Sequence, residues 1–206
     1  MKQRLADISD KIARACESVK RDPFSVTLIA VTKYVQEDAI KQALDLGLRH
    51  FGGNRVQHAA AKWPALKQDD VVLHMIGKLQ SNKMKQAAQI FDVLHTLDRL
   101  SLAEEMQRLN WVPPCFVQVN TGEEDQKSGV RPQDLEALLE DLPIKPQGLM
   151  CIPSVDEPPA LHFALLATLA RRHGLPQLSM GMSADFESAL RCGATHIRLG
   201  SVLFDE

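Results

Sequence analysis

The chain has 206 residues, of which 45% are hydrophobic and 24% charged, a composition that is ordinary for a globular protein. Its formal net charge is -2 and aromatic residues make up only 5%, so neither a positive field nor a supply of stacking side chains favours nucleic acid as a partner. No segment approaches the roughly 18 apolar residues of a membrane span, and the first residues lead into a charged amphipathic stretch, so we expect a cytoplasmic protein with no membrane partner.

The cysteines and histidines show no pattern of a disulfide framework or a metal site. No CxxC pair occurs among the cysteines, and no H-x-x-x-H pair occurs among the histidines. We therefore expect reduced, buried thiols and no metal. The cysteines are Cys16, Cys115, Cys151 and Cys192, and the histidines are His50, His58, His74, His95, His162, His173 and His196.

Short apolar runs alternate with helix-period segments from one end of the chain to the other. The expected order is a helix at residues 5–20, a strand at 26–31, a helix at 37–46, a strand at 48–51, a helix at 55–62, a strand at 71–76, a helix at 82–90 and a strand at 91–96. It continues with a helix at 99–109, a strand at 115–120, a helix at 132–139, a strand at 147–152, a helix at 158–172, a strand at 177–180, a helix at 185–191 and a strand at 195–199. About eight strand-then-helix units result, with the last helix cut short.

This alternation predicts an α/β protein with a parallel sheet. Strands covered on both faces are continuous apolar runs, and such runs fit parallel pairing better than hairpins. Repeated right-handed crossovers give either an open doubly wound sheet or a closed (β/α)8 barrel. Eight units in about 200 residues favour a single TIM-type barrel, in one domain over residues 1–206 with an extra N-terminal helix.

Lys33 is the first candidate for chemistry, because it follows the apolar run LIAVT at the end of the first expected strand. The working groups of such barrels lie at the carboxyl ends of the strands. An amine there should be partly desolvated, which makes more of the neutral form that condenses with an aldehyde. The alternative is a lysine that extends its methylenes outward and keeps its charge in water.

Two glycine-serine turns follow the seventh and eighth expected strands. Gly181 and Ser183 precede a helix, and Gly200 and Ser201 follow the last strand. Glycine lets backbone N–H groups approach an anion, and phosphate sites in barrels are often built from the loops after these two strands. The alternative is that Ser183 only caps its helix.

Other motifs give weaker evidence for a functional role than Lys33 and the two glycine-serine turns. The pair Gly77-Lys78 lacks the spacing of a Walker loop, and no G-x-S-x-G nucleophile elbow occurs. The polar loop at residues 121–128 reads as a solvated surface loop, from which Lys127 could swing toward a ligand.

Seven segments, in this order, together resemble the pyridoxal phosphate homeostasis protein family, and the resemblance spans about residues 26–203. That family is similar to the barrel domain of alanine racemase standing alone. The segments are LIAVTK (28–33), HFGGNRVQ (50–57), HMIGKLQSNK (74–83), VQVNTGEEDQKSGV (117–130), LMCIP (149–153), LSMGMSADFESAL (178–190) and HIRLGS (196–201).

The resemblance implies a site for pyridoxal 5′-phosphate (PLP). Lys33 would form the Schiff base (internal aldimine) with PLP, and Asn54 would lie beside the cofactor. Arg198 would face the pyridine nitrogen, where a permanently charged guanidinium cannot supply a proton, so the ring would be a poor electron sink. The residues that would hold the phosphate are Ser183, Gly200 and Ser201.

The chain departs from the family pattern in three places. Gly53 and His58 stand where the family usually has glutamate, which removes two carboxylates near the second loop. The chain also stops at residue 206 where the family usually continues, which should loosen the closing turn.

The resemblance implies a PLP-binding protein of vitamin B6 homeostasis that buffers or delivers the cofactor, possesses little or no turnover, and serves PLP-requiring apo-enzymes as a monomer. A PLP-dependent racemase is one alternative, but it needs acid-base groups on both cofactor faces, and strand alternation should point Tyr34 away from Lys33. A cofactor-free Schiff-base lyase is the other alternative.

Overall fold

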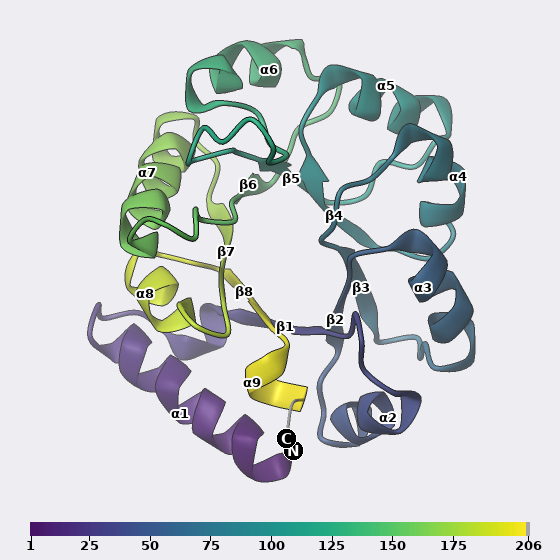
Figure 1. Cartoon of the computed structure of the whole chain (residues 1–206), viewed down its shortest axis with the longest axis vertical. Helices are drawn as coiled ribbons and strands as arrows, with labels where there is room; N and C mark the ends of the chain where they lie inside the picture. Colours follow the sequence, from purple (N-terminus) through teal and green to yellow (C-terminus); the bar gives the residue numbers. More distant parts are fainter. Residues whose placement is uncertain (205–206) are drawn as a thin grey trace.

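The apolar runs of the sequence become the strands of a closed barrel in the computed structural model, which describes residues 1–204 (Figure 1). Within those residues eight parallel strands pair in chain order, and β1 pairs with β8 to close the sheet. The predicted barrel is confirmed. The strands are β1 (Thr27–Val31), β2 (His50–Gly53), β3 (Val72–Met75), β4 (Val93–Leu97), β5 (Cys115–Gln118), β6 (Gly148–Met150), β7 (Gln177–Met182) and β8 (His196–Leu199).

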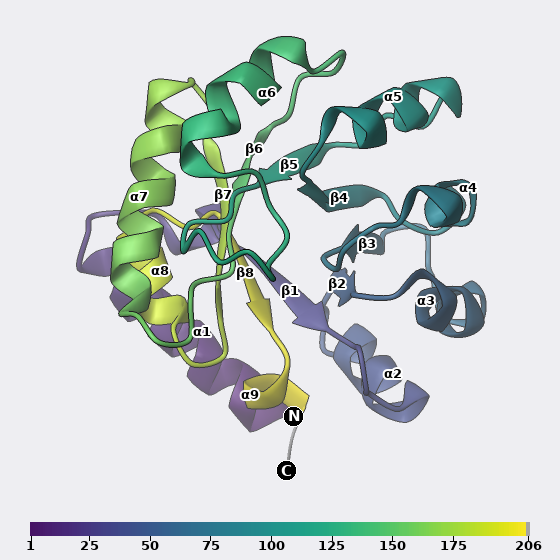
Figure 2. The same ribbon diagram turned by 45° about the horizontal axis from the view of Figure 1, so that its top comes forward.

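Helices surround the barrel on its outside (Figure 2). Their apolar faces and the outward side chains of the strands form one large core between the two layers, as parallel sheets require. The helices are α1 (Lys2–Glu17), α2 (Glu37–Asp45), α3 (Val56–Lys62), α4 (Met84–Ala87), α5 (Leu100–Arg108), α6 (Leu135–Asp141), α7 (Pro159–Arg172), α8 (Phe186–Arg191) and α9 (Ser201–Phe204).

The predicted extra N-terminal helix is α1, which buries Ile8, Ile12 and Cys16. It packs against α8 and α9 (Figure 1). The helix α9 spans Ser201–Phe204. Residues 205 and 206, where the family pattern would continue, lie outside the described residues.

Most bounds shift by one to three residues from the prediction, and two of these differences have a visible cause. The second strand begins at His50 and runs through Gly52 and Gly53, which look like turn residues in the sequence. A Cβ on Gly52 would lie 3.0 Å from Cδ1 of Ile76, so a larger residue here would require the end of the Ile76 side chain to shift. The predicted helix at residues 82–90 is shorter, because a 3-10 turn at Ser81–Lys83 precedes α4.

The thiols are free, as expected, although Cys192 is only half-buried. Burial raises the pKa of the Cys115 and Cys151 thiols to about 12, so these two are unreactive at neutral pH. Within residues 1–204, no group of three metal-ligating side chains comes together.

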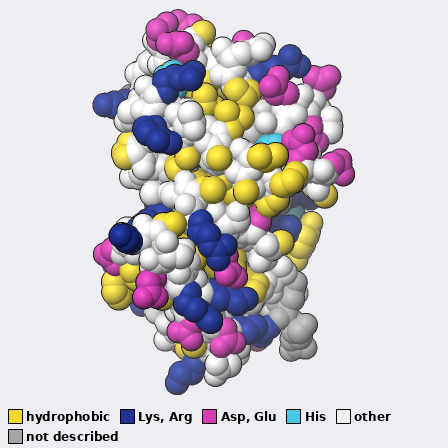
Figure 3. Space-filling view, turned by 90° about the vertical axis from the view of Figure 1, so that its left-hand side faces the viewer, with side chains coloured by type: hydrophobic (Ala, Val, Ile, Leu, Met, Phe, Trp, Pro, Cys, Tyr) yellow, Lys and Arg dark blue, Asp and Glu magenta, His cyan; other side chains and the backbone are white. Residues whose placement is uncertain are grey.

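Apolar side chains also reach the outer surface. Figure 3 shows them among charged ones on the side of the molecule that carries α7. Leu161 and Leu165 of that helix are exposed. Across the part of the chain that the structure describes, no helix has both the length and the apolar character to cross a membrane.

Candidate functional site

A cavity of about 750 Å³ opens at the carboxyl ends of β1, β7 and β8. All six residues predicted to bind the cofactor line it, although they come from widely separated parts of the sequence. The same cavity has apolar walls from Val31, Ile76 and Ile152. The six residues are Lys33, Asn54, Ser183, Arg198, Gly200 and Ser201.

Lys33 lies in a turn after β1, not in the strand itself, and its side chain is exposed. The expectation of a partly desolvated amine is therefore wrong for this structure. The expectation for Tyr34 is also wrong: strand alternation does not hold in a turn, so Tyr34 lines the same cavity. Nζ of Lys33 lies 5.4 Å from the centre of the Tyr34 ring, within the range of a cation–π contact.

Lys62 of α3 holds this turn in place. Its ammonium group donates hydrogen bonds to the carbonyl oxygens of Thr32 (3.4 Å) and Val35, which flank the Lys33 turn. Burial lowers the pKa of Lys62. The sequence analysis did not single out Lys62, because nothing in the order of residues reveals a contact about thirty positions away.

The loops after β7 and β8 meet through Ser183. Its hydroxyl oxygen accepts from the backbone N–H of Gly200 (3.3 Å) and of Val202 (3.4 Å). Ser183 therefore faces the other loop and does not cap α8, so the interpretation of this serine as a helix cap only is wrong. Asp185 fixes the first loop instead, because its carboxylate accepts from the N–H of Met182 at 2.6 Å.

Arg198 forms part of the cavity floor and is only 4% exposed. It donates from Nη1 to Oγ of Ser179 (2.7 Å) and from Nη2 to the carbonyl of Cys151 (2.9 Å). Burial lowers its pKa. Within residues 1–204 no carboxylate forms a salt bridge with this guanidinium, so neutral groups hold a buried cation.

The two departures from the family pattern near β2 lie outside the large cavity. Gly53 and His58 line a small crevice behind Lys33. A Cβ on Gly53 would lie 3.2 Å from Cε1 of Phe91, so a larger side chain here would require Phe91 to shift. Asn54 is fixed independently, because the backbone of Gly77 packs against it so closely that a Cβ on Gly77 would lie 2.2 Å from the Asn54 carbonyl oxygen.

A second cavity of about 220 Å³ adjoins the first and shares Ile76 and Ile152 with it. Lys127 lines this second cavity. Its ammonium forms an ion pair with Glu124 (2.6 Å) and donates to the carbonyl of Pro153 (3.1 Å). Lys127 is thus tied down in this structure and does not reach the six residues.

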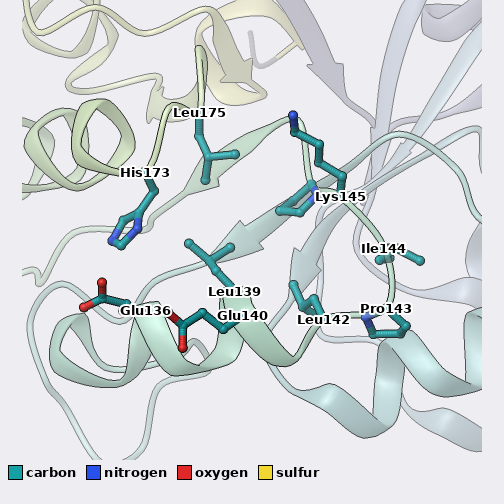
Figure 4. Close-up of a pocket in the computed structure, with 10 residues that line it drawn as sticks. Glu136, Leu139, Glu140, Leu142, Pro143, Ile144, Lys145, His173 and Leu175 are labelled. Carbon is teal, nitrogen blue, oxygen red and sulfur yellow. The ribbon is translucent and has the colours of Figure 1, made fainter.

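A further cavity, of about 450 Å³, lies at α6 and the segment that follows it (Figure 4). Its charged lining consists of Glu136, Glu140, Lys145 and His173, and none of the six residues faces it. The 750 Å³ cavity combines the amine of Lys33 with the two glycine-serine loops at Ser183 and Gly200, and it is therefore the candidate site.

Comparison with known proteins identifies the family of this chain. The family model described as alanine racemase, N-terminal domain, matches residues 4–205. The pyridoxal phosphate homeostasis proteins of Aquifex aeolicus and Pseudomonas aeruginosa are 39% and 40% identical, over 99% and 98% of this chain and 97% and 94% of theirs. The structure of PipY from Synechococcus elongatus with PLP bound superimposes with a TM-score of 0.79 at 37% identity, covering 94% of this chain and 99% of that one.

Proposed function

The chain belongs to the pyridoxal phosphate homeostasis protein family, and we propose that it binds PLP through Lys33 and buffers or delivers this cofactor in the cell. The observation that carries the proposal is the meeting of all six predicted residues around one cavity. The PLP bound to the related PipY structure supports it.

The residues that line the cavity fit the aldehyde, the phosphate and the ring nitrogen of PLP. When bound, PLP supplies an aldehyde that condenses with an amine. Lys33 offers a primary amine on an accessible turn. Ser183 and Ser201 offer hydroxyl groups beside the backbone N–H of Gly200, a donor set suited to a phosphate. Arg198 offers further N–H donors to a ring nitrogen, but a guanidinium does not give up its proton, so that nitrogen stays uncharged.

Borohydride reduction tests the attachment. We expect protein incubated with PLP and reduced to carry the pyridoxyl group on the peptide that contains Lys33. The Lys33→Ala variant should carry none, and Lys78→Ala, a control from the neighbouring cavity, should be labelled as the parent protein is. Label confined to another lysine in the parent protein would contradict the assignment.

We further propose that one PLP-binding barrel domain spans residues 1–206, that it acts in the cytoplasm as a monomer, and that it passes PLP to apo-enzymes. The names of the relatives support cofactor homeostasis and speak against a cofactor-free lyase. A racemase-like activity is the second candidate, because Tyr34 lines the cavity beside Lys33.

Little or no turnover is the proposal that we favour. Racemisation needs acid-base groups on both faces of the cofactor, whereas Lys33 and Tyr34 come from the same turn. We expect D- and L-alanine to exchange their α-hydrogen with deuterated water far more slowly than the roughly 10 per second of a median enzyme, as followed by proton NMR. Exchange at enzymatic rates that is lost in Tyr34→Phe would establish the racemase-like alternative.

A further inference from the structure

A row of polar side chains crosses the barrel interior from Arg198 to the amino-terminal end of β2. Oγ of Ser179 lies 2.7 Å from Nη1 of Arg198 and 2.8 Å from Nδ1 of His95. Nε2 of His95 lies 2.8 Å from Nδ1 of His74, and Nε2 of His74 lies 2.9 Å from Nδ1 of His50. We call Ser179, His95, His74 and His50 the histidine column.

The column crosses the barrel through its interior. Ser179 belongs to β7 and His95 to β4, which do not pair with each other, so their hydrogen bond spans the inside of the barrel. His95 is fully buried and stacks on the ring of Phe116 at 4.4 Å, and His74 is 1% exposed. Solvent reaches the column only at His50, which is half-buried.

Arg198 fixes the direction of every hydrogen bond in the column. Guanidinium nitrogens only donate, so the Ser179 oxygen accepts and its own proton goes to Nδ1 of His95. His95 then carries its proton on Nε2 and donates to His74, which in turn donates from Nε2 to His50. In the opposite direction Ser179 would accept from both sides, and its buried hydroxyl proton would have no acceptor among the described residues.

This direction suits a buried cation that has no carboxylate partner. Each neutral imidazole presents its lone pair on Nδ1 toward Arg198 and its N–H away from it. The negative ends of the aligned dipoles therefore face the guanidinium, and hydrogen bonds in such a chain strengthen one another. Burial lowers the pKa of His74 and His95 well below the usual value, which keeps the rings neutral.

We propose that Ser179, His95 and His74 are positioning residues for Arg198: their one-directional hydrogen bonds hold the guanidinium in the cavity floor and so set its contact with the PLP ring. The inference rests on the proposed function, because only a bound ring gives that contact a purpose. The column itself is a property of the protein without ligand.

The tautomers test the column directly. We expect long-range ¹H–¹⁵N spectra of the unliganded protein at neutral pH to show the Nε2–H form for His95, His74 and His50 together. An Nδ1–H form at His95 would overturn the proposal. This measurement needs neither PLP nor a variant, so it stays decisive even if PLP binding fails.

Variants of His95 test whether the histidine column affects the binding of the PLP ring. His95→Leu should weaken PLP binding by up to about ten-fold, the upper end of the effect of one lost neutral hydrogen bond, here the bond from Ser179 to His95, and shift the absorption maximum of bound PLP. The amide of glutamine in His95→Gln can accept and donate hydrogen bonds, so this variant should restore the affinity for PLP and the absorption maximum. His196→Leu is the matched control, because this ring lies 5.9 Å from that of His95 but, among the described residues, has its side-chain hydrogen bond with Thr195 and none with the histidine column.

The outcomes separate the two proposals. Absence of PLP binding in the parent protein would refute the proposed function. The tautomers measured in the unliganded protein would still test the histidine column. Equal losses in His95→Leu and His196→Leu would mean that any interior substitution disturbs the site, and the positioning role would be refuted. Loss in His95→Leu alone, with rescue by His95→Gln, supports it.

Discussion

Replacing both Ser183 and Ser201 by alanine should weaken PLP binding by about 100-fold or more. A hydrogen bond to a charged group contributes roughly 1.5–3 kcal/mol, so two lost hydroxyl donors correspond to about 3–6 kcal/mol. The backbone N–H groups of Gly200 and Val202, which bond to Ser183 in this structure, remain as donors and keep the loss from being complete. An absorbance titration with PLP gives the dissociation constant.

Pyridoxal, which lacks the phosphate, is the matched ligand control. Its weaker binding should change little in the double variant, because in the proposed site the lost hydroxyls bind only the phosphate. A double variant that binds PLP as the parent protein does would remove these serines from the site. Equal weakening for PLP and pyridoxal would instead indicate that the cavity had changed shape.

Mild acid should destabilise the protein strongly. Burial holds the pKa of His74 and His95 well below the usual value and lowers that of His196 to about 4. In the unfolded chain each would titrate near about 6.5. Between those values the unfolded state binds more protons, so the stabilisation is fully present above pH 6.5 and is lost as the pH falls toward 4.

At pH 5 the loss amounts to about 2 kcal/mol for His196, whose pKa is lowered to about 4, and the lowered pKa values of His74 and His95 act in the same direction. Domains are typically stable by only about 5–15 kcal/mol, so unfolding at pH 5 should need far less urea than at pH 7.5. His196→Leu should make the pH dependence shallower, whereas His58→Gln, at an exposed position, should leave it unchanged. A free energy of unfolding that is equal at both pH values would contradict this account.

Much of the fold could be predicted because each strand is a short apolar run bounded by polar residues. The prediction was weakest at β2, because Gly52 and Gly53 resemble a turn in the sequence, and only the structure shows them packed against Ile76 and Phe91. It also failed in the turn of Lys33 and Tyr34, because alternation between faces applies only while the backbone stays extended.

The candidate site was predictable for a different reason. In a parallel barrel all strands end at one face, so residues after β1, β7 and β8 had to come near one another. The histidine column was missed, because a histidine in a strand looks the same whether it faces the helices or the interior. The shared position of His74, His95 and Ser179, third in their strands, was the available signal.

The closure of β1 onto β8 has a consequence for synthesis on the ribosome. Thr27 pairs with His196, so β1 waits for a partner that is made about 170 residues later. Until then one edge of β1 is open, and exposed edges of this kind invite pairing with other chains. The helix α1, whose partners α8 and α9 are also made late, cannot dock earlier. The nascent chain therefore stays vulnerable to aggregation until β8 has left the exit tunnel.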